Sequence, residues 1–197
     1  MSKKTINPKK DELIKAAIIE AASRVFQKWG LKKSTMEDIA EEAGKGKSTL
    51  YYYFKSKEEI FDIVLRGETD RILANAKAAV EHEPETKEKL KKYIISTLTE
   101  MRKNANVYSI VRGEIKGNKL LIEKLKKEFI TREESFIKEL FRDGIRTNEL
   151  KFINADEIDI AAKAFVGILA ALDLYLFVET EDFGQIDITA KLISNII

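Results

Sequence analysis

Four lysines and a run of hydroxyl-bearing side chains lie close together between residues 34 and 57, and this combination is suited to binding nucleic acid. The cations that can neutralise phosphates there are Lys45, Lys47, Lys55 and Lys57. Ser48 and Thr49 are short enough to hydrogen-bond base edges or phosphates. The three tyrosines at 51–53 can place a hydroxyl on a phosphate or a ring against a thymine methyl. The chemistry that these residues predict is DNA binding.

Two short helical patterns joined by a tight turn position these side chains. Ser34 and Glu37 have the spacing of a capping box, which predicts the start of the first helix. Its apolar face is formed by Met36, Ile39, Ala40 and Ala43. Gly44 supplies the left-handed residue that commonly ends a helix. A second helix follows, and on it Leu50 and Phe54 are four residues apart and can face a core.

This pattern is the outline of a helix-turn-helix, whose second helix enters the DNA major groove with its N-terminus first. On spacing alone, the alternative is an ordinary pair of solvated helices with a lysine-rich face. Residues 1–60 carry a net charge of +4, from thirteen Lys or Arg and nine Asp or Glu, whereas the remainder carries −2. A basic first third followed by a nearly neutral remainder favours an N-terminal DNA-binding domain followed by a sensing domain.

Residues 10–60 resemble the DNA-binding domain of the tetracycline-repressor (TetR) family of bacterial transcription regulators. The matching residues are Ala17, Phe26, Gly30, Thr35, Ile39, Ala40, Ala43, Gly44, Thr49, Leu50, Tyr51, Tyr52, Phe54, Lys57, Glu58, Glu59 and Ile60. The DNA-contacting residues that we predict are Thr35, Lys45, Gly46, Lys47, Ser48, Thr49, Tyr51, Tyr52, Tyr53 and Lys57.

The chain departs from the TetR pattern at two places among these predicted DNA-contacting residues. The family usually has Val-Ser after the turn glycine, where this chain has Lys45 and Gly46, and it often has His where Tyr53 stands. Gly46 is a weaker N-cap than Ser. These departures do not change the predicted fold. They mean that the operator sequence of this protein cannot be inferred from those of other family members.

We expect an all-α chain of about nine helices, because it has only two prolines and nine glycines and no long alternating run. The first helix should begin at Pro8 and end at Gly30, with Trp29 and Leu31 packed in the small core. A fourth helix should begin near Lys57 and run towards Val80. We therefore place a DNA-binding domain at residues 1–56 and a ligand-sensing and dimerisation domain at residues 57–197. Further helices are expected around residues 90–101, 107–112, 118–146, 154–177 and 185–197, with a joint between Gly113 and Gly117.

The TetR resemblance implies a homodimer in which the last two long helices form a four-helix interface with the partner. Small residues that would allow close approach are Ala161, Ala162, Ala164, Gly167, Ala170 and Ala171. Apolar area would come from Ile168, Leu172, Leu176, Ile188, Leu192, Ile193 and Ile196. The alternative to a dimer interface is that these residues pack in the core of a single protomer. A symmetric dimer would present two recognition helices to the half-sites of a palindromic double-stranded DNA operator.

A small-molecule pocket in the second domain is also implied by the resemblance. The candidate lining residues are Tyr93, Thr97, Met101, Tyr108, Phe129, Phe136, Phe165, Leu169 and Asp173. For each aromatic residue the alternative is plain core packing. Asp173 is a carboxylate inside an apolar run, where burial without a partner would be costly. It could anchor a ligand, pair with an arginine or face solvent at the edge of the dimer.

Several other classes of protein are disfavoured by composition. There is no cysteine and one histidine, His82 beside Pro84, so we expect no catalytic nucleophile pair, no metal site and no cofactor. Gly46-Lys47-Ser48 imitates the end of a phosphate-binding loop, but Glu41 stands where that motif needs glycine. The longest apolar run, residues 164–178, is short for a membrane span and contains an aspartate. We expect a cytoplasmic protein with neither signal peptide nor membrane contact.

The function that these features predict is a homodimeric repressor that leaves its operator when a small ligand, of unknown identity, occupies the second domain. The alternative is a DNA-binding protein of the same fold without a small-molecule inducer, either architectural or governed by a protein partner. An internal cavity with polar anchors would favour the first, and a filled core would favour the second.

Overall fold

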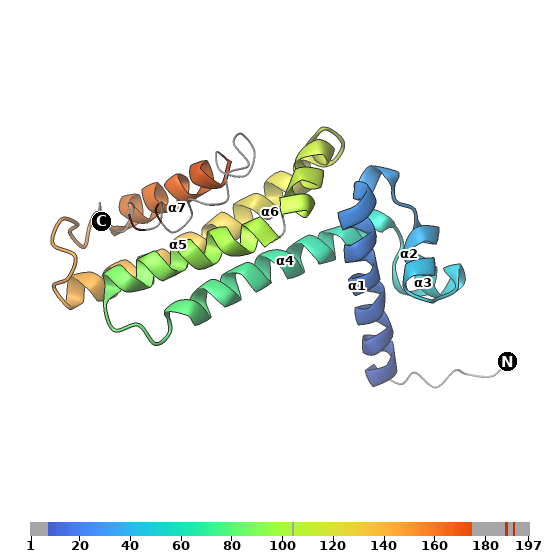
Figure 1. The fold of residues 1–197 in the computed structure, drawn as a ribbon, viewed down its shortest axis with the longest axis horizontal. Coiled ribbons are helices and arrows are strands. Elements are labelled where there is room, and N and C mark those ends of the chain that lie inside the picture. Colours follow the sequence, from blue (N-terminus) through green and yellow to red (C-terminus); the bar gives the residue numbers. More distant parts are fainter. Residues whose placement is uncertain (1–7, 104, 175–187, 189–190, 192–197) are drawn as a thin grey trace. The chain divides into compact units, whose positions relative to one another are not determined.

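The computed structural model describes residues 8–103, 105–174, 188 and 191, without the side chains of 101, 102, 105–122, 125, 173 and 174. Within this part of the chain there are seven α-helices and no strand (Figure 1). The helices are α1 (Pro8–Lys33), α2 (Met36–Glu42), α3 (Lys47–Tyr53), α4 (Lys57–Val80), α5 (Thr86–Lys103), α6 (Ala105–Arg146) and α7 (Ile158–Leu174). The all-α prediction is confirmed, whereas the expected count of nine helices differs from the seven in the described residues. No helix among them has both the length and the apolar character needed to cross a bilayer.

The difference in helix number has an identifiable cause in α6. The sequence predicts separate helices at 107–112 and 118–146, but α6 runs without interruption for 42 residues. A glycine inside a helix costs only about 1 kcal/mol relative to alanine, so Gly113 and Gly117 weaken the helix without ending it. The helix ends at Arg146, where Asn148 adopts a positive φ of 59°. The helix expected over 185–197 lies outside the described residues, apart from positions 188 and 191.

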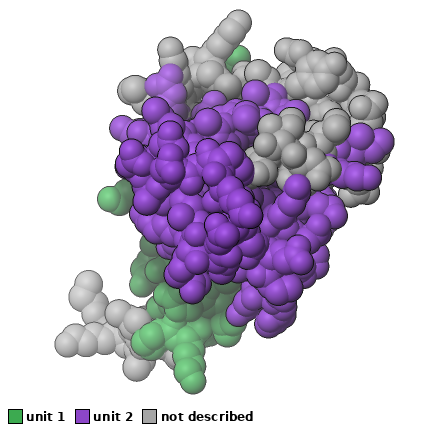
Figure 2. All heavy atoms as spheres, turned by 90° about the vertical axis from the view of Figure 1, so that its left-hand side faces the viewer, with its two compact units in different colours: residues 1–68, 109–121 green, residues 69–108, 122–197 purple. Residues whose placement is uncertain are grey.

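The chain divides into two compact units (Figure 2). Unit 1 comprises Met1–Glu68 and Ser109–Leu121, and unit 2 comprises Thr69–Tyr108 and Ile122–Ile197. Helix α4 therefore contributes residues 57–68 to unit 1 and residues 69–80 to unit 2. The domain boundary that we placed between residues 56 and 57 remains a prediction.

The core of unit 1 is built where the helical stripe of α1 meets the following three helices. Phe26 and Phe61 pack edge to face with ring centroids 5.1 Å apart. Leu50 and Phe54 are buried as predicted. Trp29 is 52% exposed, so the expectation that it packs in this core is wrong. Gly30 turns the backbone with φ 75° and ψ 168°. Leu31, the next residue, is buried as predicted.

The capping box of α2 lies one residue later than its predicted position. The Thr35 Oγ1 accepts a hydrogen bond from the Asp38 backbone N–H at 3.1 Å, and the Thr35 N–H donates to the Asp38 carboxylate at 2.8 Å. The Ser34 hydroxyl instead donates to the Gly30 carbonyl at the end of α1. The Ser34–Glu37 assignment was therefore wrong. Since Ser and Thr both cap helices, the local sequence allowed either register.

Unit 2 is a helical body whose core combines the second half of α4 with α5, α6 and α7. Phe141 of α6 and Phe165 of α7 pack edge to face with centroids 5.9 Å apart. Its fully or nearly fully buried residues include Ala76, Val80, Leu90, Tyr93, Ile94, Leu98, Ile137, Leu140, Ala162, Val166 and Leu169. Each of these four helices thus contributes apolar residues to one core within the protomer.

Candidate nucleic-acid interface

Helices α2 and α3 are joined by a turn that the backbone itself closes. Gly44 has a φ of 60°, as its predicted role requires, and the Lys45 N–H donates to the Ala40 carbonyl at 2.9 Å. Gly46 is the N-cap of α3 and provides no side-chain hydrogen bond. The prediction of a weak cap at this point is confirmed.

The outward face of α3 is determined by the residues that α3 buries. Leu50 is inaccessible, and Phe54 immediately after the helix is 4% exposed, so both attach α3 to unit 1. Tyr51 is 48% exposed and Tyr52 is 71% exposed. Among the other predicted DNA contacts, Lys45, Gly46, Lys47 and Ser48 are exposed and Thr49 is half-buried. The structure therefore brings a continuous set of hydroxyl and ammonium groups to one surface of unit 1.

Lys47 is held at this surface by a residue of the preceding helix. Its ammonium forms an ion pair with the Glu37 carboxylate and lies 5.9 Å from the centre of the Tyr51 ring. The hydrogen bond from Lys47 lowers the pKa of Glu37, and the same bond raises the pKa of Lys47. Glu37 lies ten residues away in sequence and was expected only as a capping residue. A phosphate that binds Lys47 must compete with this carboxylate.

Besides Lys47, three of the predicted DNA contacts make hydrogen bonds within unit 1, and their contact with DNA stays a prediction. Thr35 caps α2, as described above. The Tyr53 hydroxyl donates to the Asp11 carboxylate at 2.7 Å. The Lys57 ammonium donates to the carbonyls of Leu31 and Ser34, both at 2.8 Å. The partner of Thr35 lies only three residues away, whereas the partners of Tyr53 and Lys57 lie more than twenty residues away in sequence, too far for spacing to reveal them.

We predict that Tyr53→Phe changes the alkaline stability of the protein. The bond to Asp11, followed by burial, raises the pKa of Tyr53 to about 12 from about 10. Below pH 10 the folded and unfolded states both keep the proton, and the stabilisation is complete. Between about pH 10 and pH 12 the unfolded state loses the proton first, so the free energy of unfolding falls as pH rises.

The measurement is urea unfolding across this alkaline range for the wild type and for Tyr53→Phe. The variant should be less stable than the wild type at pH 8 and should lose less stability on going to pH 11. Tyr52→Phe, which removes a hydroxyl from the exposed neighbouring ring, is the matched control. Equal pH dependence of the wild type and Tyr53→Phe would contradict the assignment.

Six of the nine predicted ligand-pocket residues of unit 2 have described side chains, and their role in lining a ligand pocket stays a prediction. Tyr93, Thr97, Phe165 and Leu169 are buried in the core, and Phe129 and Phe136 are half-buried. The side chains of Met101, Tyr108 and Asp173 lie outside the described residues.

Two of these buried residues carry polar groups. The Tyr93 hydroxyl donates to the Glu133 carboxylate at 3.0 Å, and burial and this charge raise the pKa of Tyr93. The Thr97 side chain is buried one helical turn beyond Tyr93 on α5. Thr86, Glu100 and Glu133 are also buried in unit 2, so its interior holds several polar groups.

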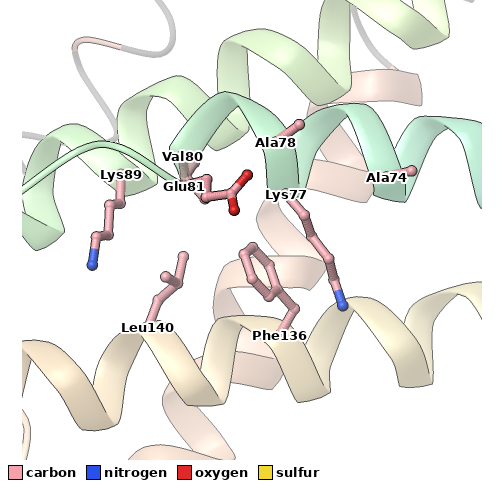
Figure 3. A pocket seen from close by; sticks show the side chains of 8 residues that line it. All are labelled: Ala74, Lys77, Ala78, Val80, Glu81, Lys89, Phe136 and Leu140. Carbon is pink, nitrogen blue, oxygen red and sulfur yellow. The ribbon is translucent and has the colours of Figure 1, made fainter.

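A pocket of about 480 Å³ lies elsewhere in unit 2 and shares only Phe136 with the predicted set (Figure 3). Its lining residues are Ala74, Lys77, Ala78, Val80, Glu81, Lys89, Phe136 and Leu140. Sequence reasoning missed most of them because the alanines and lysines of α4 read as an ordinary solvated helix face.

Comparison with known proteins agrees with the geometry of unit 1. Residues 18–64, which include α2, α3 and the start of α4, match the family described as bacterial regulatory proteins of the tetR family. Residues 18–64 thus carry a DNA-binding region of the TetR type. Among the relatives of the chain is the HTH-type transcriptional regulator YhgD of Bacillus subtilis, 29% identical over 148 residues, which are 70% of this chain and 72% of YhgD.

Two further comparisons extend the similarity to known regulators beyond residues 18–64. The fatty acid metabolism regulator protein of B. subtilis is 24% identical over 134 residues, which are 68% of this chain and 69% of the relative. The solved structure of FadR from B. subtilis, in complex with stearoyl-CoA, superposes with a TM-score of 0.73 at 19% identity. That match covers 92% of this chain and 96% of FadR, and it shows a shared fold. With this DNA-binding region and these relatives, the chain is a DNA-binding transcription regulator rather than an enzyme.

Proposed function

We propose that this regulator is a homodimeric repressor that binds a palindromic operator and is released when a small molecule occupies unit 2. The observation that carries the proposal is the surface of α3. Leu50 and Phe54 fix one face of this helix in the core, and the tyrosines and lysines around the opposite face remain accessible. A helix of this kind can enter the major groove while its neighbours contact the backbone.

The proposed contacts divide into positioning and reading groups. In the described residues neither Lys45 nor Lys55 has an ion-pair partner for its ammonium, so both are available to phosphates. Tyr52 is the most exposed tyrosine of α3 and is assigned to the backbone. Ser48, Thr49 and Tyr51 occupy the first turns of α3 and are assigned to base edges.

The proposed dimer uses the free face of α7. Ala162, Phe165, Val166 and Leu169 of this helix are buried inside the protomer. Ile160 is 74% exposed and Ile168 is 49% exposed, and Ala164, Gly167 and Ala171 on the same face are also exposed. A Cβ placed on Gly167 would meet no atom within 4 Å. This small, apolar surface supports the predicted interface, except that Ala162 belongs to the protomer core.

Release by a ligand requires that the ligand bind the DNA-competent and released states with different affinities. The stearoyl-CoA complex of FadR gives one case of this fold with a bound small molecule. It supports a small-molecule effector for this chain.

The test is selection from random duplex DNA at physiological salt with the full chain. Enrichment of an inverted repeat is the expected result, because a symmetric dimer reads each half-site twice. Purely non-specific binding that weakens uniformly with salt would contradict the proposal and favour an architectural protein.

Among point variants, Thr49→Ala and Tyr51→Ala should relax base preference. We expect each to lose about 1–3 kcal/mol of discrimination at the base pairs it reads. Lys45→Ala should instead weaken binding to all sequences and lower the salt slope by about 1. The measurement is titration of the selected operator and its single-base variants at several salt concentrations. If selectivity is unchanged in both Thr49→Ala and Tyr51→Ala, the reading residues lie elsewhere.

A further inference from the structure

The pocket in unit 2 is formed by one face of α4 packed beside α6, with Lys89 of α5 at its edge (Figure 3). Ala74, Lys77, Ala78 and Glu81 follow the spacing of one helical face. The alanines end at Cβ, so they leave the Phe136 ring of α6 partly exposed. This replacement of bulk by alanine explains why a pocket exists at an otherwise ordinary helix pair.

The floor of the pocket is apolar and continuous with the core of unit 2. Leu140 is buried and Val80 is buried, and both belong to the core cluster. The ring of Phe136 is half-buried and packs beside Tyr93, with centroids 5.4 Å apart. A ligand that covers the exposed part of the Phe136 ring removes apolar surface from water, which is the main driving force for binding in such pockets.

The rim of the pocket has more positive than negative charge. Lys77 and Lys89 lie at opposite ends in Figure 3, with Phe136 and Leu140 between them and Glu81 near the middle. The Lys77 ammonium is 4.9 Å from the centre of the Phe136 ring. In the described residues it has no ion-pair partner. Two ammonium groups against one carboxylate favour an anion over a cation.

We infer that this pocket binds an amphipathic carboxylate, with its apolar chain over Phe136 and Leu140 and its anionic end at Lys77. The volume of about 480 Å³ lies within the range of about 300–1,000 Å³ that is typical of small-molecule sites. The inference rests on the proposed function, because it makes this ligand the effector of the regulator. Four pocket residues belong to α4, and residues 57–68 of the same helix belong to unit 1. A ligand in the pocket therefore contacts a helix that contributes residues to both units.

The test is calorimetric titration of the full chain with dodecanoate, with dodecyltrimethylammonium as the probe of opposite charge. Dodecanoate should bind with one site per chain and more tightly than the cation. Lys77→Met should weaken dodecanoate binding about tenfold or more, since it removes a charged contact. Glu81→Gln should strengthen it, because the carboxylate repels the anion. Ala78→Trp, which fills the pocket from an exposed position, should abolish it. Lys87→Met is the matched control, since Lys87 is exposed on α5 outside the pocket.

Tighter binding of the cation would overturn the inference, and so would unchanged dodecanoate binding in either Lys77→Met or Ala78→Trp. Circular dichroism of each variant separates loss of the site from loss of the fold. The same proteins are then titrated with the selected operator. Failure to select any operator contradicts the proposed function, whatever dodecanoate does. Sequence-selective DNA binding that is equally strong with and without bound dodecanoate overturns the effector role alone.

Discussion

Ile168→Glu should convert the protein to a monomer and reduce its affinity for the selected operator by about a hundredfold or more. Ile168 lies on the free face of α7 and is half exposed in the single protomer. In the proposed dimer this face is covered, and a carboxylate introduced there would lose water without gaining a partner. Such burial costs several kcal/mol, which is enough to separate two subunits. A monomer carries one recognition helix and loses the advantage of binding both half-sites together.

The measurements are sedimentation velocity for the mass and operator titration for the affinity. Phe152→Glu is the matched control, because Phe152 is also a large exposed apolar residue but lies between α6 and α7. It should leave both the mass and the operator affinity unchanged. A dimeric Ile168→Glu protein with wild-type operator affinity would show that the interface lies on another surface.

Lys57→Met should destabilise the protein by about 2–4 kcal/mol, because it removes charged hydrogen bonds to three carbonyls at the end of α1, two of them at 2.8 Å. Leu31 and Ser34, which carry the two closer carbonyls, are both buried residues. A helix end leaves its last carbonyls without intrahelical partners, and here the ammonium of Lys57 supplies the missing donors. The methionine side chain has similar length but no donor, so the packing changes little while the hydrogen bonds are lost.

The alternative role for Lys57 is the phosphate contact that the sequence predicts, and the two roles have different signatures. A phosphate contact would lower the salt slope of DNA binding by about 1 in the variant and leave its stability unchanged. Urea unfolding and salt-dependent operator titration of Lys57→Met distinguish them. Lys55→Met is the control two residues away, where an exposed lysine without an ion pair should change stability by less than about 0.5 kcal/mol.

The location of the pocket illustrates the limit of pattern reading in unit 2. Phe136 was predicted as a lining residue and is one, whereas Tyr93 and Phe165, predicted on the same grounds, are core residues. An aromatic residue on an apolar stripe has the same pattern in both roles. The distinction depends on what the opposite helix presents, and at Phe136 that helix presents Ala74 and Ala78.

The sequence by itself determined the all-α fold, the helix-turn-helix and the buried positions of Leu50 and Phe54, because each depends on contacts or periodicity within a few residues. Only the tertiary structure decided which polar side chains among the predicted DNA contacts form hydrogen bonds within the protein. Tyr53 pairs with Asp11 across 42 residues, and Lys57 reaches Leu31 across 26. Such pairs leave no periodic signal, since chain folding rather than spacing brings the partners together. The same reason explains why α4, α5 and α6 had to be assembled before the pocket between them could be recognised.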